Sequence, residues 1–213
     1  ICTIDADFFH DLFQNIFLTY NNYLAEQDAL VKVDSTVVGI SSKLVSWTLS
    51  SGGTNKSDKK HLKYSVALKG SLPCSVKIYD TAEMASEDKA LSELIYESKN
   101  AKGAVVVFDR GVQSRNVFDQ LSSSRQIFVG RLRTGAAKIN AIEELEIAGK
   151  PVHATVSIIS DVRCKLYTRT HKETLSEYRI IKAVIDKSSE DIIFITNDFT
   201  LGAYDIAALY KQR

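Results

Sequence analysis

The chain has 213 residues, of which 45% are hydrophobic and 25% are charged, and its formal net charge is +1. This composition supplies a substantial core and excludes a disordered chain. It carries no overall basic signature, so a nucleic-acid partner would have to meet local patches. No apolar run approaches the roughly 18 residues of a membrane span. The three cysteines lack zinc or disulfide-framework spacing, which favours a reducing cytoplasm.

The first half of the chain predicts a helix, a group of three strands and a second helix. Apolar residues recur at helical spacing over 6–27. Residues 30–40, 62–69 and 74–80 are rich in strand-forming residues and can build an antiparallel meander. Residues 83–99 place three apolar side chains on one face among many acids, which is typical of a surface helix.

The second half predicts helices that alternate with strands. Residues 104–109, AVVVFD, are a short apolar strand of the kind that is buried on both faces. Ser114 is predicted as the N-cap of the helix that follows it. The other predicted elements are a helix over 115–123, strands over 126–132 and 191–197, and a helix over 201–213 that reaches the last residue without a cap.

Residues 133–190 differ, because they contain no convincing long helix. The stretches VHATVSII, VRCKLYTR and YRIIKAVI predict successive antiparallel strands. Without this segment, the element order is that of an RNase H-like fold, an α/β architecture with a mixed five-stranded sheet, flanking helices and a β-rich insertion. The predicted divisions are a helical segment over 1–29, the first part of the core over 30–132, the insertion over 133–190 and the end of the core over 191–213.

Two aspartates stand at the strands of this predicted core. Asp34 lies within a strand, where Asp is disfavoured unless it faces solvent, and Asp109 follows an apolar strand, where Asp also serves as a turn residue. In an RNase H-like sheet the two strands are neighbours, so both carboxylates would converge on one edge. Close carboxylates repel unless a proton or a cation lies between them. Oxygen-only ligands favour Mg²⁺ or Mn²⁺, and two such ions about 4 Å apart can cleave a phosphodiester.

Three stretches carry a resemblance to a known family. They are VDSTVV, then VVVFDRGVQSRNVFDQL followed by IFVGRLR, and finally IIFITNDFTLGAYDIAALYKQR. In this order they resemble the three catalytic motifs of the DDE transposases of bacterial insertion sequences. The resemblance covers nearly the whole chain and includes a β-rich segment between the second and third motifs, which in this family helps to hold DNA ends.

The resemblance implies roles for individual residues. Asp34 and Asp109 match the first two metal-binding catalytic carboxylates, with two Mg²⁺ or Mn²⁺ ions expected in the complete protein. Tyr210 and Arg213 match the start of the family's Tyr-x2-Arg-x3-Glu-x6-Lys signature and are expected at the DNA. The third carboxylate, a Glu, is expected four residues after Arg213, so we expect a truncated and inactive chain. Neither Glu190 nor Asp198, which could mimic that ligand, lies in the right motif.

Basic residues are concentrated after the second motif. Residues 125–172 hold nine Lys and Arg against four acids, an arrangement that forms either a phosphate-binding face or a solvated surface. Arg131 and Arg133 are the strongest candidates for DNA contacts, because they alternate on one strand. Arg110 either braces Asp109 or contacts phosphate.

These patterns predict the catalytic domain of a DNA transposase. Such enzymes cleave a phosphodiester at a transposon end and join the freed 3′-hydroxyl to target DNA, usually as dimers on double-stranded DNA in the bacterial cytoplasm and nucleoid. One alternative is a catalytically inactive DNA-binding transposase fragment. Another is a resolvase or nuclease that shares the fold, and the match at Tyr210 and Arg213 disfavours it.

Overall fold

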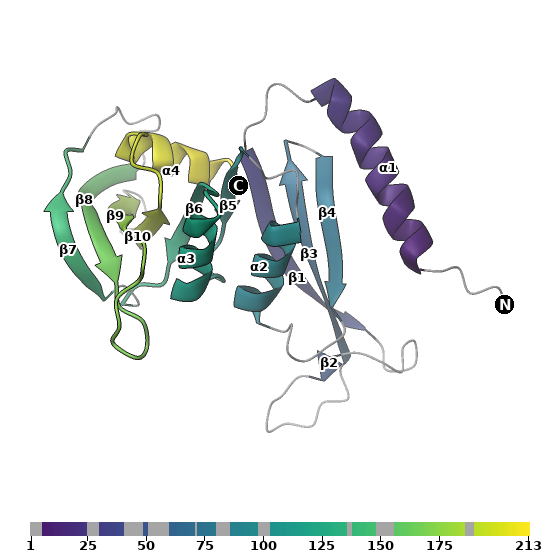
Figure 1. The fold of residues 1–213 in the computed structure, drawn as a ribbon, viewed down its shortest axis with the longest axis horizontal. Helices are drawn as coiled ribbons and strands as arrows, with labels where there is room; N and C mark the ends of the chain where they lie inside the picture. Colours follow the sequence, from purple (N-terminus) through teal and green to yellow (C-terminus); the bar gives the residue numbers. More distant parts are fainter. Residues whose placement is uncertain are drawn as a thin grey trace.

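The computed structural model describes residues 6–24, 30–40, 49–50, 60–70, 72–79, 86–97, 103–135, 138–147, 156–185 and 190–213. In these ranges the chain folds into four helices and one large mixed sheet (Figure 1). None of the helices so described is long and apolar enough to cross a membrane.

The elements follow one another much as the periodicity predicts. The helices are α1 (Ala6–Leu24), α2 (Glu87–Glu97), α3 (Arg115–Ser123) and α4 (Ala203–Lys211). The strands are β1 (Leu30–Ile40), β2 (Leu49–Ser50), β3 (Lys60–Lys69), β4 (Leu72–Tyr79), β5 (Val105–Phe108), β6 (Phe128–Leu132), β7 (Ile139–Glu144), β8 (Val156–Leu166), β9 (Tyr178–Ile185) and β10 (Glu190–Thr196).

The sheet has ten strands in the order β2-β3-β1-β5-β6-β10-β9-β8-β7, and β4 also pairs with β3. Strands β1, β5 and β6 are parallel, whereas β1, β3 and β4 form the predicted antiparallel meander. The predicted mixed α/β sheet with flanking helices is therefore confirmed. The predicted number of five strands is wrong, because β10 pairs with β6 on one side and with β9 on the other. The β-rich segment thus continues the same sheet (Figure 1).

Within the β-rich segment, two predicted strands are one. Residues 156–159 and 162–166 of the stretches predicted over 152–159 and 162–169 belong to the single strand β8, with a shift of register between Ile158 and Ser160, and residues 152–155 lie outside the described residues. In the sequence, the polar residues Ser160 and Asp161 resemble a loop between two strands. In the structure Asp161 is buried within β8, at 1% exposure. Strand β7, which was not predicted, pairs with β8 at the end of the sheet.

Two hydrophobic cores cover opposite faces of the sheet. The first packs α2 and α3 against the strands and includes Val33, Leu94 and Phe118. The second packs α4 against the other face and includes Val107 and Ile206. Alternation along each strand explains the division, because successive side chains point to opposite faces.

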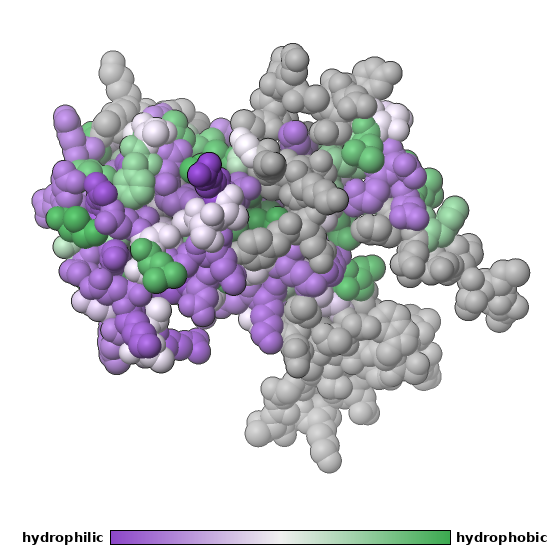
Figure 2. Space-filling model, in the orientation of Figure 1, coloured by the Kyte–Doolittle hydropathy of each residue, from purple (hydrophilic) through white to green (hydrophobic). Residues whose placement is uncertain are grey.

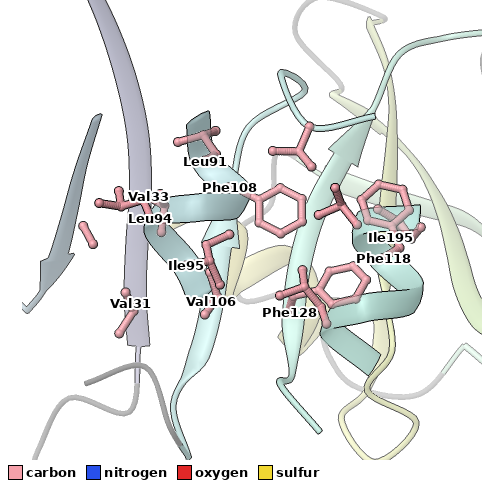
Figure 3. Close-up of a cluster of buried hydrophobic side chains, with 14 of the residues drawn as sticks. Val31, Val33, Leu91, Leu94, Ile95, Val106, Phe108, Phe118, Phe128 and Ile195 are labelled. Atoms are coloured by element: carbon pink, nitrogen blue, oxygen red, sulfur yellow. The ribbon is translucent and has the colours of Figure 1, made fainter. Parts of the chain in front are cut away.

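Three phenylalanine rings fill the first core between the sheet and α3 (Figure 3). The rings of Phe108, Phe118 and Phe128 stack with centroids 5.5–6.3 Å apart. The backbone of β6 approaches this cluster closely at Gly130, where an added Cβ would lie 2.3 Å from the ring of Phe108. Any larger residue at this point of the motif IFVGRLR would have to displace the Phe108 ring, so this position favours glycine.

Candidate metal and nucleic-acid site

The sheet register brings Asp34 and Asp109 side by side. Strand β1 pairs in parallel with β5 from Leu30 to Val33, opposite Val105 to Phe108, and the next residue on each strand is an aspartate. Both carboxylates lie on the face that carries α4, because Asp34 is four positions beyond Leu30 and Asp109 is two positions beyond Val107, and both of these residues pack in the core of that face. The two aspartates converge on one edge, as the RNase H-like arrangement predicted.

Local structure explains why aspartates are tolerated there. Strand β5 ends at Phe108, so β1 has no β5 partner from Asp34 onward, although its pairing with β3 continues to Ile40. The Asp34 side chain is 70% exposed and the Asp109 side chain 35% exposed. The Asp109 carboxylate also accepts a hydrogen bond from the backbone N–H of Arg110 at 2.7 Å, at the start of a turn. Asp109 therefore also acts as a turn residue, the alternative considered from the sequence.

Two side chains at the end of α4 contact this carboxylate pair. The Tyr210 hydroxyl donates to Asp109 Oδ1 at 2.8 Å. The Arg213 guanidinium lies 3.3 Å from Asp109 Oδ2 and 3.6 Å from Asp34 Oδ1. The structure therefore brings together four residues that the sequence singled out, from β1, from α4, and from the residues that follow β5 and α4.

These contacts shift the pKa values of Asp109 and Tyr210. Burial would raise the pKa of Asp109, but the Arg110 N–H, the Tyr210 hydroxyl and the charges of Arg213 and Arg131 together hold it below its ordinary value. Burial and the hydrogen bond to Asp109 raise the pKa of Tyr210 to about 12. Asp109 is consequently ionised, and Tyr210 protonated, across the neutral range.

The loop after Asp109 is fixed by residues that sequence reasoning missed. The Gln113 amide donates to the carbonyls of Arg110 and Arg131, and its oxygen accepts the N–H of Arg133. Asp88 of α2 accepts the N–H groups of Gln113 and Ser114, at 2.5 and 2.7 Å. Ser114 is the N-cap of α3, as predicted, but its side chain makes no capping hydrogen bond. Asp88 instead holds the backbone of the N-cap residue and of the residue before it.

The predicted basic residues surround the same edge. Arg131 lies on β6 and is close enough to lower the pKa of Asp109, and Arg133 follows the end of β6 and is exposed. Arg110 is also exposed and contacts Asp109 through its backbone N–H. Hydrophilic side chains dominate the surface around α3 and β7 in the view of Figure 2.

No third carboxylate joins Asp34 and Asp109 in the part of the chain that the structure describes, and no cluster of three metal-ligating residues occurs there. Asp198 lies beyond the end of β10, which runs antiparallel to β6, so it is at the opposite edge of the sheet. Its carboxylate accepts bonds from Thr200 and Leu201 that lower its pKa despite burial. The side chain of Glu190 is outside the described residues.

A buried ion pair, also missed from sequence, anchors the start of α4. Arg179 of β9 pairs with Asp161 of β8, and the two are 3% and 1% exposed. Arg179 Nη1 also donates to the carbonyls of Asp198 and Leu201, at 3.0 and 2.6 Å. The insertion strands thereby fix the loop from which α4 departs. A lone Arg and a lone Asp 18 residues apart carry no sequence signal of such pairing.

An apolar groove of about 360 Å³ runs between α4 and strands β8 to β10, with Phe194, Tyr204 and Ala207 in its lining. Tyr210 and Arg213, which contact the carboxylates, also line this groove. Of the residues of α4, Ala203 and Ile206 are buried.

Comparison with known protein families agrees with the resemblance seen in the motifs. No match is found among curated proteins. Among solved structures, the NurA nuclease from Sulfolobus solfataricus is similar at 9% sequence identity, over 97% of this chain and 85% of that chain, with a TM-score of 0.42. The family described as the transposase DDE domain matches residues 26–213. The chain therefore belongs to the transposase DDE domain family.

Proposed function

We propose that this chain is the catalytic domain of a DNA transposase, which cleaves and joins phosphodiester bonds with divalent cations held by Asp34 and Asp109. One observation carries the proposal. Carboxylates from two separate strands meet at one sheet edge and share a single guanidinium, that of Arg213. Membership of the transposase DDE domain family supports it.

We further infer an RNase H-like core, which the strand order β4-β3-β1-β5-β6 supports, with two antiparallel pairings followed by two parallel ones. In this proposal 30–132 and 191–213 form the core, 133–190 is an insertion that holds DNA, and 1–29 is a preceding helical segment.

The donor set at the site fits Mg²⁺ or Mn²⁺. Both side chains offer oxygen only, and Mg²⁺ in particular is commonly bound by one or two carboxylates together with substrate phosphates. Bound divalent cations would polarise the phosphodiester and activate the attacking hydroxyl group or water. We propose that two such ions bind at this carboxylate pair together with substrate phosphates.

The surrounding side chains have supporting roles in this proposal. Tyr210 orients Asp109 through its hydroxyl and remains protonated at neutral pH, because its pKa is raised to about 12. Arg131, Arg133 and Arg110 are placed to bind DNA phosphates, as Arg213 also is when released from the carboxylates. The partner is double-stranded DNA at transposon ends and target, bound by a homodimer in the bacterial cytoplasm, at the nucleoid.

Calorimetric titration with Mn²⁺ tests the metal site. We expect binding by the chain and its loss in Asp34→Asn and in Asp109→Asn, whereas Asp191→Asn, which alters an exposed aspartate of β10, binds like the parent. Binding that survives both site substitutions would show that the carboxylates are not ligands.

Fluorescence anisotropy with a labelled duplex tests the DNA surface over a range of salt concentrations. Arg131→Gln and Arg133→Gln should each weaken binding and reduce the salt slope by about 0.9 for each phosphate that the variant no longer neutralises. Duplex binding without any Mn²⁺ binding would identify the chain as the alternative, a DNA-binding module without catalysis. Failure to bind either would contradict both functions.

A further inference from the structure

One guanidinium bridges the two proposed metal ligands. Arg213 Nη1 lies 3.6 Å from Asp34 Oδ1, and Nη2 lies 3.3 Å from Asp109 Oδ2. The Arg213 side chain is 25% exposed, so it is held against the sheet edge, while the Asp34 side chain is 70% exposed. Arg213 is thus the counter-ion of two carboxylates that would otherwise repel each other.

The end of α4 positions the guanidinium. Arg213 lies two residues beyond Lys211, the last residue of α4, and its backbone N–H donates to the carbonyl of Tyr210 at 3.2 Å. The guanidinium carbon lies 6.0 Å from the centre of the Tyr210 ring, whose hydroxyl bonds to Asp109. Asp109 is therefore engaged at both oxygens, at Oδ1 by Tyr210 and the Arg110 N–H, and at Oδ2 by Arg213.

A cation that binds both aspartates needs one oxygen from each. At Asp109, each oxygen that the cation could bind already accepts a hydrogen bond from Tyr210 or contacts Arg213, and the positive charge of the Arg213 guanidinium lies beside it. We propose that Arg213 is a built-in competitor of the divalent cation, which neutralises Asp34 and Asp109 until the cation displaces it. This inference rests on the proposed function, because it takes the two aspartates as metal ligands.

A plain structural role for Arg213 predicts the opposite sign. If the ion pairs served only to hold the carboxylates in place, removing the guanidinium would disorder them and weaken cation binding. A competitor, by contrast, weakens cation binding while it is present, so its removal strengthens binding. The direction of the change in Mn²⁺ affinity therefore separates the two roles.

The experiment measures Mn²⁺ affinity by calorimetry for the chain, for Arg213→Gln and for Arg213→Lys. Lys211→Gln is the matched control, because it removes the same charge from the same exposed end of α4 without a described contact to the aspartates. We expect Arg213→Gln to bind roughly tenfold more tightly, since a unit charge beside a divalent ion is removed. Arg213→Lys and Lys211→Gln should stay within roughly twofold of the parent.

Thermal unfolding supplies a second measurement. Without Mn²⁺, Arg213→Gln should melt below the parent because the carboxylates lose their counter-ion, and saturating Mn²⁺ should raise its melting temperature more than that of the parent. Unchanged or weaker Mn²⁺ affinity in Arg213→Gln would overturn the inference alone, provided that the parent binds and Asp109→Asn does not. Absence of Mn²⁺ binding by every variant would overturn this inference and the proposed metal site together.

Discussion

Replacing Arg179 with Met should destabilise the chain strongly, because it leaves a buried charge without a partner. Asp161 is 1% exposed and is paired with Arg179, which also donates to two backbone carbonyls in the loop before α4. Breaking such a pair from one side costs about 3–5 kcal/mol. For a chain of this size that corresponds to a fall in melting temperature of roughly 6–20 °C.

Urea unfolding and thermal scans measure the effect, and a second arginine provides the control. Arg163 lies on the neighbouring strand β8 and pairs with Glu177 at 2.5 Å, but its side chain is 41% exposed. Arg163→Met should therefore cost no more than about 1 kcal/mol. The double variant Arg179→Met with Asp161→Val should lose clearly less unfolding free energy than the sum of the losses in Arg179→Met and Asp161→Val alone. Equal losses of unfolding free energy in Arg179→Met and Arg163→Met would refute the reasoning.

Two further changes test the packing and the electrostatics of the site. Gly130→Ala should cost about 1–3 kcal/mol, because its Cβ meets the Phe108 ring at 2.3 Å, and adding Phe108→Leu should recover part of that loss in urea unfolding. Tyr210→Phe should raise the pKa of Asp109, as followed by carbon NMR of its carboxyl group, because a bond that lowers the pKa is removed. Since the folded pKa of Asp109 is depressed, its contribution to stability is present above its ordinary value of 3.8 and is lost as pH falls through the folded value, so the variant should lose less stability in acid. An Asp109 pKa that stays the same in Tyr210→Phe would contradict that assignment.

The sequence predicted the elements best where local patterns decide them. The strand before Asp109 follows from a short continuous apolar run, and the helix over 115–123 follows from apolar residues at helical spacing. The convergence of Asp34 and Asp109 required the additional assumption that their strands are neighbours, and the register of β1 against β5 agrees with it.

Long-range pairing accounts for what sequence could not predict. The continuation of the sheet depends on β10 accepting a partner on each side, which no local pattern specifies. In the same way Asp161 resembles a polar break within a strand segment until its partner Arg179 on β9 is known. Asp88 and Gln113 fix the loop after Asp109 through bonds between segments far apart in sequence, which leave no motif.

The groove beneath α4 has a consequence for how the molecule opens. The helix buries Ala203 and Ile206, while β5 on the neighbouring part of the sheet buries three consecutive residues, Val106 to Phe108. Amide hydrogen exchange should accordingly be faster in α4 than in β5, since local unfolding follows the amount of buried apolar contact. Detachment of α4 would withdraw Tyr210 and Arg213 from the aspartates while the sheet stays folded. The carboxylate pair would then lose its partners in a partly open molecule, at a lower free energy than global unfolding requires.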